Sequence, residues 1–183
     1  MLVERGLAVL LFDYRGYGRS EGKPSEHGLY LDATTAYRYL VHRRGVSPSR
    51  VICFGRSIGT GVALHVALRE KVAGLIMESA FENVPAMVRR RPLLWLPALF
   101  MRNRFDNLIR IRRLAVPLLM THGDRDSLVP VEQGRAVFAA APEPKEFYVI
   151  EGAGHNDTYE AGGEAYFEAL RRFCYRCVER KGH

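Results

Sequence analysis

Short apolar runs alternate along the chain with stretches whose apolar residues recur at helical spacing. The runs predict five strands, at residues 7–12, 51–54, 74–78, 117–121 and 146–150. The intervening periodicity predicts helices at residues 31–41, directly after Ser57, at 131–140 and at 164–178. Strands that alternate with helices form a mostly parallel sheet with helices on both faces. The pattern therefore predicts an α/β fold, and the continuous run Leu7–Phe12 predicts a strand buried on both faces.

One segment breaks this alternation. Residues 79–113 lie between the third and fourth predicted strands and are too many for a simple crossover. The segment holds three prolines and the apolar cluster Leu93–Leu96. We expect a short helical cap folded over the carboxyl edge of the sheet, because long insertions in a domain often carry function. Leu94 and Trp95 are then candidate substrate-binding residues. A helix pair packed on the flank of the sheet, away from any substrate, is the alternative.

Length and composition describe one ordinary globular domain. The chain has 183 residues, of which 48% are hydrophobic, and it shows no internal repeat or linker. We therefore treat residues 1–183 as a single domain, with residues 79–113 as an insertion within it.

The net charge of +7 is concentrated in the insertion. Residues 84–113 hold eight arginines and one acid, Asp106, so this segment alone accounts for the whole excess. The charge fits either a solvated helix face or peripheral contact with an anionic membrane or an acidic substrate. Because no nucleic-acid-binding motif accompanies it, we expect no nucleic-acid partner.

The cysteines indicate neither a disulfide scaffold nor a metal site. There are three of them, Cys53, Cys174 and Cys177. The last two form a C-x-x-C pattern inside a predicted helix, and no second pair of ligands completes a zinc site. We expect no metal and no cofactor.

Membrane and export signals are also weak. The longest apolar stretch, Leu93–Met101, contains Pro97 and is far shorter than the ~20 residues that a membrane span needs. The first residues do not resemble a signal peptide. We expect a cytoplasmic protein, or one that is membrane-associated through an N-terminal segment outside this sequence.

Candidate chemistry begins at Gly55-Arg56-Ser57-Ile58-Gly59. This is a G-x-S-x-G pattern with a predicted strand before it and a predicted helix after it, the context of a nucleophile elbow. The tight turn pushes the central hydroxyl out at the top of the sheet, so Ser57 is the candidate nucleophile. The alternative is a glycine-rich turn whose serine caps the next helix.

A serine nucleophile needs a base and a carboxylate that orients the base. His155 follows the fifth predicted strand, after Gly152-Ala153-Gly154, and is the candidate base. Asp126 follows the fourth strand and is preferred as the acid over Asp124, which we expect to shape the turn by bonding backbone amides. Five other histidines are weaker candidates for the base: His27, His42, His65, His122 and His183.

At these residues the chain resembles the serine-hydrolase branch of the α/β-hydrolase superfamily. It is similar in detail to bacterial relatives of the eukaryotic α/β-hydrolase-domain depalmitoylases. The similar stretches are residues 12–20, 55–61, 78–81, 122–126 and 152–155, in the expected order. In the H-G-x-x-D pattern of that family the triad acid falls on Asp126. The resemblance implies cleavage of an ester, thioester or amide through an acyl-serine intermediate.

The resemblance also shows what this sequence lacks. The oxyanion hole of such enzymes uses the backbone N–H of the residue after the nucleophile, here Ile58, and a second donor from an earlier loop. No His-Gly loop precedes Ser57, so the second donor is absent. The family's first strands are also missing, which leaves an empty slot between residues 7–12 and 51–54. Either the first predicted strand slides into that slot, or the chain is a fragment of a longer protein.

The sequence thus predicts a carboxylesterase- or thioesterase-like serine hydrolase. Its substrate is a small molecule or an acylated protein with an apolar acyl part. The alternatives are a non-catalytic binding or interaction module on a hydrolase scaffold, and an inactive fragment. A dehalogenase of the same fold is disfavoured because its nucleophile is an aspartate and the elbow here holds Ser57. The oligomeric state does not follow from the sequence.

Overall fold

Four parallel strands form the sheet in the structure, a computed structural model that describes residues 2–89 and 103–179. They are β1 (Ile52–Arg56), β2 (Gly74–Glu78), β3 (Leu118–Gly123) and β4 (Lys145–Ile150), in the order β1-β2-β3-β4. Each strand pairs in parallel with the next. All four carboxyl ends therefore lie along one edge of the sheet, where the predicted site residues follow the strands.

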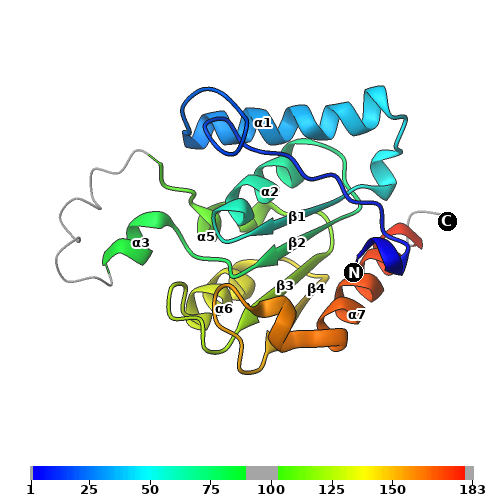
Figure 1. Cartoon of the computed structure of the whole chain (residues 1–183). Coiled ribbons are helices and arrows are strands. Elements are labelled where there is room, and N and C mark those ends of the chain that lie inside the picture. Colours follow the sequence, from blue (N-terminus) through cyan, green and yellow to red (C-terminus); the bar gives the residue numbers. More distant parts are fainter. Residues whose placement is uncertain (1, 90–102, 180–183) are drawn as a thin grey trace.

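Helices connect the strands and cover them (Figure 1). The longer ones are α1 (Glu26–Arg38), α2 (Ile58–Arg69), α6 (Val131–Ala140) and α7 (Thr158–Glu179). Short elements are the 3-10 turns at Val3–Arg5, Pro48–Arg50 and Ile111–Arg113, the π-helical turn at Tyr39–Arg43, and the helices α3 (Val84–Arg89) and α5 (Asn107–Arg110). The prediction of α6 is confirmed at both ends, and α2 begins directly after Ser57 as predicted. Helices α1 and α7 begin five and six residues before their predicted starts.

Side chains of the central strands alternate between two cores. On β2, Leu75 and Met77 join a core built with α1, α2 and α6, whereas Ile76 joins a second core with α7. Strand β3 follows the same alternation. Both strands are buried along their whole length. The prediction of a parallel sheet covered on both faces is confirmed.

The predicted strand at Leu7–Phe12 is wrong. These residues form no strand, and most of their side chains are exposed, with Leu11 at 86%. A parallel strand is stable where neighbouring strands satisfy its amide and carbonyl groups. Within the described residues β1 pairs with β2 alone, so it is an edge strand, and Phe54 on it is 43% exposed. The run has therefore not moved into the slot beside β1.

Part of the insertion is described, and it is anchored to the first long helix. One carboxylate oxygen of Glu26 accepts hydrogen bonds from the backbone amides of Arg104 (2.7 Å) and Phe105 (3.2 Å). Residues 90–102, which include Leu94, Trp95 and three of the eight arginines, lie outside the described residues. The cap over the site and its contact with substrate or membrane therefore stay predictions.

The C-terminal helix has the apolar face that the sequence indicates. Tyr166, Leu170, Phe173 and Cys177 are all buried in the second core. Cys174 is also buried, and neither of the two cysteines forms a disulfide within the described residues, in agreement with a packing role for the C-x-x-C pattern. Across residues 2–89 and 103–179, no helix combines the length and the apolar character needed to cross a bilayer.

Candidate active site

Ser57 occupies a strained turn between β1 and α2. Its backbone has φ 51° and ψ −121°, a conformation that non-glycine residues rarely adopt. The turn is tight because the neighbouring glycines leave room for it: a Cβ on Gly55 would lie 2.0 Å from the carbonyl oxygen of Gly59. The Ser57 amide donates to the carbonyl of Glu78 at 2.9 Å, which joins the turn to the end of β2. The expected strand-turn-helix context is thus present.

Asp126 is held in the loop after β3 by the backbone around it. Its Oδ1 atom accepts hydrogen bonds from the amides of Leu128 (3.0 Å) and Val129 (2.7 Å). The side chain is buried, and its Oδ2 atom faces the loop after β4. The loop backbone therefore fixes one carboxylate oxygen and leaves the other for the histidine.

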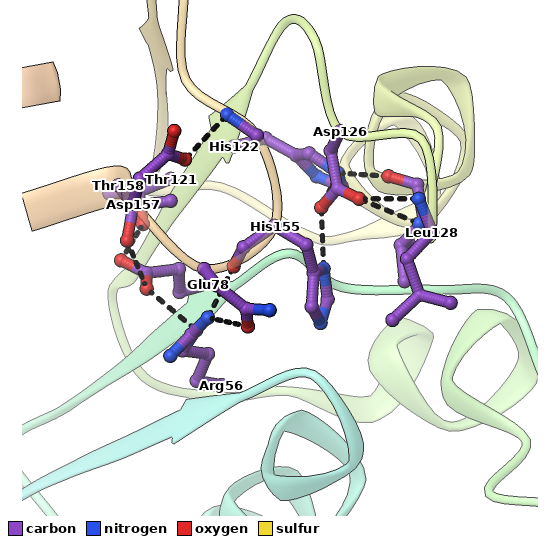
Figure 2. A network of polar contacts seen from close by, with 12 residues as sticks. Arg56, Glu78, Thr121, His122, Asp126, Leu128, His155, Asp157 and Thr158 are labelled. Atoms are coloured by element: carbon purple, nitrogen blue, oxygen red, sulfur yellow. Dashed lines mark hydrogen bonds and ion pairs between the residues drawn. The ribbon is translucent and has the colours of Figure 1, made fainter.

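His155 lies against that second oxygen (Figure 2). The distance between His155 Nδ1 and Asp126 Oδ2 is 2.7 Å. An ionised carboxylate can accept but not donate, so Nδ1 carries the proton and Nε2 is the nitrogen that can accept one. Such a pair is the arrangement in which an imidazole can act as a general base.

The hydroxyl of Ser57 and the ring of His155 do not form a hydrogen bond among the described contacts. The turn that carries Ser57 is nonetheless linked to the loop of His155, because Arg56, directly before Ser57, donates to the backbone carbonyl of His155. Hydrogen bonds to a nucleophile are often long in structures without substrate. The structure thus brings Asp126 and His155 together and places the elbow beside them.

The electrostatics favour an ionised Asp126. Burial is the largest single influence and acts to raise its pKa, but the influences that lower the pKa, led by the hydrogen bonds from His155 and from the Val129 amide, outweigh burial in sum. The pKa of Asp126 therefore lies below its ordinary value. At neutral pH the carboxylate is charged and can stabilise a positive charge on the His155 ring.

Two neighbouring residues have structural roles. His122 is fully buried, its Nε2 donates to the Val129 carbonyl at 2.7 Å, and burial lowers its pKa. Asp124 accepts a hydrogen bond from the amide of Gly152 at 2.7 Å, so it ties the two loops together. The expectation that Asp124 bonds backbone amides is confirmed, although its partner belongs to the other loop.

Ile58 is the first residue of α2, and its amide has no hydrogen-bond partner within residues 2–89 and 103–179. The first N–H groups of a helix have no partner within it, so this group can face an oxyanion near Ser57.

Sequence reasoning missed one group of residues beside the site, Arg56 and Glu78. Glu78 is 2% exposed and interacts with Arg56 at the carboxyl edge of the sheet. One signal was available in the sequence, because a glutamate ends the otherwise apolar strand 74–78. Nothing in the spacing, however, indicated what it would contact.

Comparison with known sequences places this site in context. The sequence profile of the family described as serine aminopeptidase, S33, matches residues 1–109. An uncharacterized protein of Mycobacterium tuberculosis strain H37Rv is 39% identical over 169 residues, which cover 92% of this chain and 60% of that protein. The α/β-hydrolase domain-containing protein 17B of Xenopus laevis is 36% identical over 165 residues, 90% of this chain and 55% of that protein. The chain thus spans little more than half the length of these relatives.

Solved structures share the same architecture. The esterase domain of a Rhodothermus marinus protein superposes with a TM-score of 0.71 at 26% identity, covering 97% of this chain and 76% of that one. A Pyrococcus furiosus esterase gives a TM-score of 0.78 at 23% identity, covering 96% of this chain and 73% of that one. The second likeness supports the fold, and both confirm the predicted fold class.

Proposed function

The chain belongs to the serine aminopeptidase S33 family of α/β hydrolases, and on that premise we propose that it is a serine hydrolase acting through an acyl-serine intermediate. Ser57 is the nucleophile, His155 the general base, and Asp126 the residue that orients His155 and stabilises its charged form. The observation that carries the proposal is the 2.7 Å contact between His155 Nδ1 and Asp126 Oδ2 beside a strained serine turn.

The first half-reaction follows from these positions. Nε2 of His155 takes the hydroxyl proton as Ser57 attacks the substrate carbonyl, and Asp126 stabilises the imidazolium that forms. The N–H of Ile58 donates to the developing oxyanion. His155 then returns the proton to the departing alcohol or thiol, and the acyl group stays on Ser57. A water molecule activated by the same base hydrolyses this acyl-serine in the second half-reaction.

The substrate is an ester or thioester with an apolar acyl part. The esterase domain at 26% identity supports the ester class, and the leucines and tryptophan of the insertion support an apolar acyl group. Each buried methylene contributes about 0.8 kcal/mol of transfer free energy, so longer acyl chains bind better until the site is filled. We therefore expect kcat/KM to rise along a series of acyl chain lengths.

Hydrolysis of p-nitrophenyl esters and of the matching acyl-CoA thioesters, from acetyl to palmitoyl, tests the proposal. We expect turnover by the parent chain and loss of nearly all of it in Ser57→Ala. Ser49→Ala is a matched control, since Ser49 lies in the exposed turn before β1, at the opposite end of that strand from Ser57. Equal turnover by Ser57→Ala and the parent would refute the mechanism, and a flat chain-length profile would refute the apolar acyl group. Absence of turnover in the parent would favour a non-catalytic module.

A further inference from the structure

A buried carboxylate, that of Glu78, lies next to the turn that carries Ser57. Glu78 ends β2 and is 2% exposed. Its two oxygens are surrounded by donors: Thr158 Oγ1 at 2.9 Å, Thr121 Oγ1 at 3.1 Å, the Tyr166 hydroxyl at 2.6 Å and Arg56 Nε at 3.4 Å. A buried carboxylate is costly unless it is paired and hydrogen-bonded, and the four donors around Glu78 meet that requirement. The pKa of Tyr166 is raised by burial and by the charge of Glu78, which keeps that hydroxyl a donor.

Arg56 connects this carboxylate to the backbone of the proposed base. Parallel pairing of β1 with β2 places Arg56 opposite Glu78. One Nη atom of Arg56 donates to the carbonyl of His155 and also to Oδ1 of Asn156, the latter at 2.7 Å (Figure 2). The planar guanidinium can hold several acceptors at once in a fixed geometry. Arg56 therefore joins the end of β2 to the loop that carries His155.

Glu78 makes two further contacts, one with the residue that follows the loop of His155 and one with the elbow. Thr158, which donates to Glu78, is the first residue of α7 and follows the loop between β4 and α7. The backbone carbonyl of Glu78 accepts from the Ser57 amide at 2.9 Å. Glu78 thus holds the backbone of the nucleophile directly, and it holds the loop of the base through Arg56 and through Thr158 at the end of that loop.

We propose that Arg56 and Glu78 are positioning residues that set the ring of His155 against the hydroxyl of Ser57, an inference that rests on the proposed function. Catalytic groups must be held within about 0.5 Å of their productive positions. A misplacement of about 1 Å can cost ~10²-fold in rate. The hydrogen bond to Asp126 fixes one nitrogen of His155, and the Arg56 contact fixes the backbone from which the ring projects. Neither Arg56 nor Glu78 has a part in the proton transfer itself.

Replacement of Arg56 by methionine removes the link to His155 and keeps an unbranched apolar side chain in place of the aliphatic part of the arginine. We expect kcat for ester hydrolysis to fall ~10- to 100-fold, with KM changed about twofold or less, because substrate contacts are untouched. Arg56→Lys keeps one positive charge but cannot bond as many acceptors, so we expect it to recover part of kcat. Arg38→Met is the matched control. Arg38 pairs with Glu70 at 3.1 Å, and Glu70 follows the last residue of α2, whereas Ser57 precedes the first.

Arg56→Met leaves the buried charge of Glu78 uncompensated, which can destabilise the fold. The double variant Arg56→Met/Glu78→Gln removes both charges together and keeps hydrogen-bonding capacity for Thr121, Thr158 and Tyr166. We expect its melting temperature to stay near that of the parent while kcat stays low. A double variant that folds as well as the parent and has parental kcat overturns the proposal.

A measurement without turnover separates this inference from the proposed function. In protein labelled with 15N-histidine, we expect the Nδ1 proton of His155, held by Asp126, to resonate far downfield. We expect that signal to shift or broaden in Arg56→Met and to stay unchanged in Arg38→Met. If the parent hydrolyses no ester but the signal shifts, the positioning role stands and the proposed function fails. If the parent is active and neither the signal nor kcat changes in Arg56→Met, the positioning role fails.

Discussion

Replacement of Asp126 by asparagine isolates the charge of the carboxylate from its place in the loop. Asparagine has the same shape, and its carbonyl oxygen can still accept from the amides of Leu128 and Val129, which hold Oδ1 at 3.0 and 2.7 Å. The NH2 group then faces Nδ1 of His155. Because an amide N–H donates, Nδ1 must become the acceptor and the ring proton moves to Nε2, the nitrogen that should receive the proton of Ser57.

The size of the effect follows from the distance. His155 Nδ1 and Asp126 Oδ2 are 2.7 Å apart, which puts the centres of the two charged groups about 4 Å apart when the imidazolium forms. At an effective dielectric constant of ~20, such a pair interacts by ~4 kcal/mol. Each ~1.4 kcal/mol lost from the transition state lowers the rate tenfold. We therefore expect Asp126→Asn to lower kcat about 10³-fold, with little change in KM.

Steady-state hydrolysis of a p-nitrophenyl ester measures the change in kcat, and the urea midpoint shows whether the variant is folded as stably as the parent. Asp124→Asn is the control from the same loop, because Asp124 bonds the amide of Gly152 and does not touch His155 in the described contacts. We expect the control to keep kcat within about threefold of the parent. A folded Asp126→Asn variant with kcat also within threefold would show that the carboxylate does not stabilise the base, and the assignment of Asp126 would be wrong.

Three further predictions concern the fold around the site. Burial, together with the charge of a nearby arginine, lowers the pKa of His65 to about 4, so the unfolded chain binds more protons than the folded one between pH ~6.5 and ~4. Relative to His65→Phe, the parent should lose stability as pH falls through that window and regain it on return to pH 7; equal pH profiles in urea unfolding would contradict this. Gly55→Ala should lower the free energy of unfolding by at least ~1–3 kcal/mol, because its Cβ would lie 2.0 Å from a backbone oxygen. Gly59→Ala is the control, since its Cβ would meet its nearest neighbour at an ordinary 3.7 Å. Equal urea midpoints for the two variants would refute the packing argument. Burial raises the pKa of the Cys174 thiol to about 11, so iodoacetamide at pH 8 should modify it slowly in the folded chain and rapidly in urea, as peptide mass spectrometry can show.

The sequence predicts most elements because their apolar periodicity reports what each face contacts. Helix α6 begins and ends at the predicted residues, and β2 does so as well. The strand predicted at Leu7–Phe12 fails for a physical reason. A continuous apolar run indicates that a segment can be buried, but a strand also needs neighbours for its backbone groups, and hydrophobicity does not report those. The exposed Leu11 is the consequence.

The candidate site could likewise be predicted only in part. Asp126 and His155 could be predicted because parallel strands bring their carboxyl ends to one edge, so the loops after two strands meet there. The contact of Arg56 with Glu78 depends on the register of β1 against β2, and that of Arg56 with the His155 carbonyl depends on how a loop closes over the sheet. Neither is encoded in local spacing, so both had to be seen in the structure.

Covalent labelling shows whether Ser57 is the nucleophile. The chain is treated with a fluorophosphonate probe, digested with trypsin after Arg56 and Arg69, and analysed by mass spectrometry. We expect one adduct on the peptide of residues 57–69, located on Ser57, which Ser57→Ala abolishes and Asp126→Asn slows. Labelling that persists in Ser57→Ala, or an adduct on another residue, would contradict this assignment.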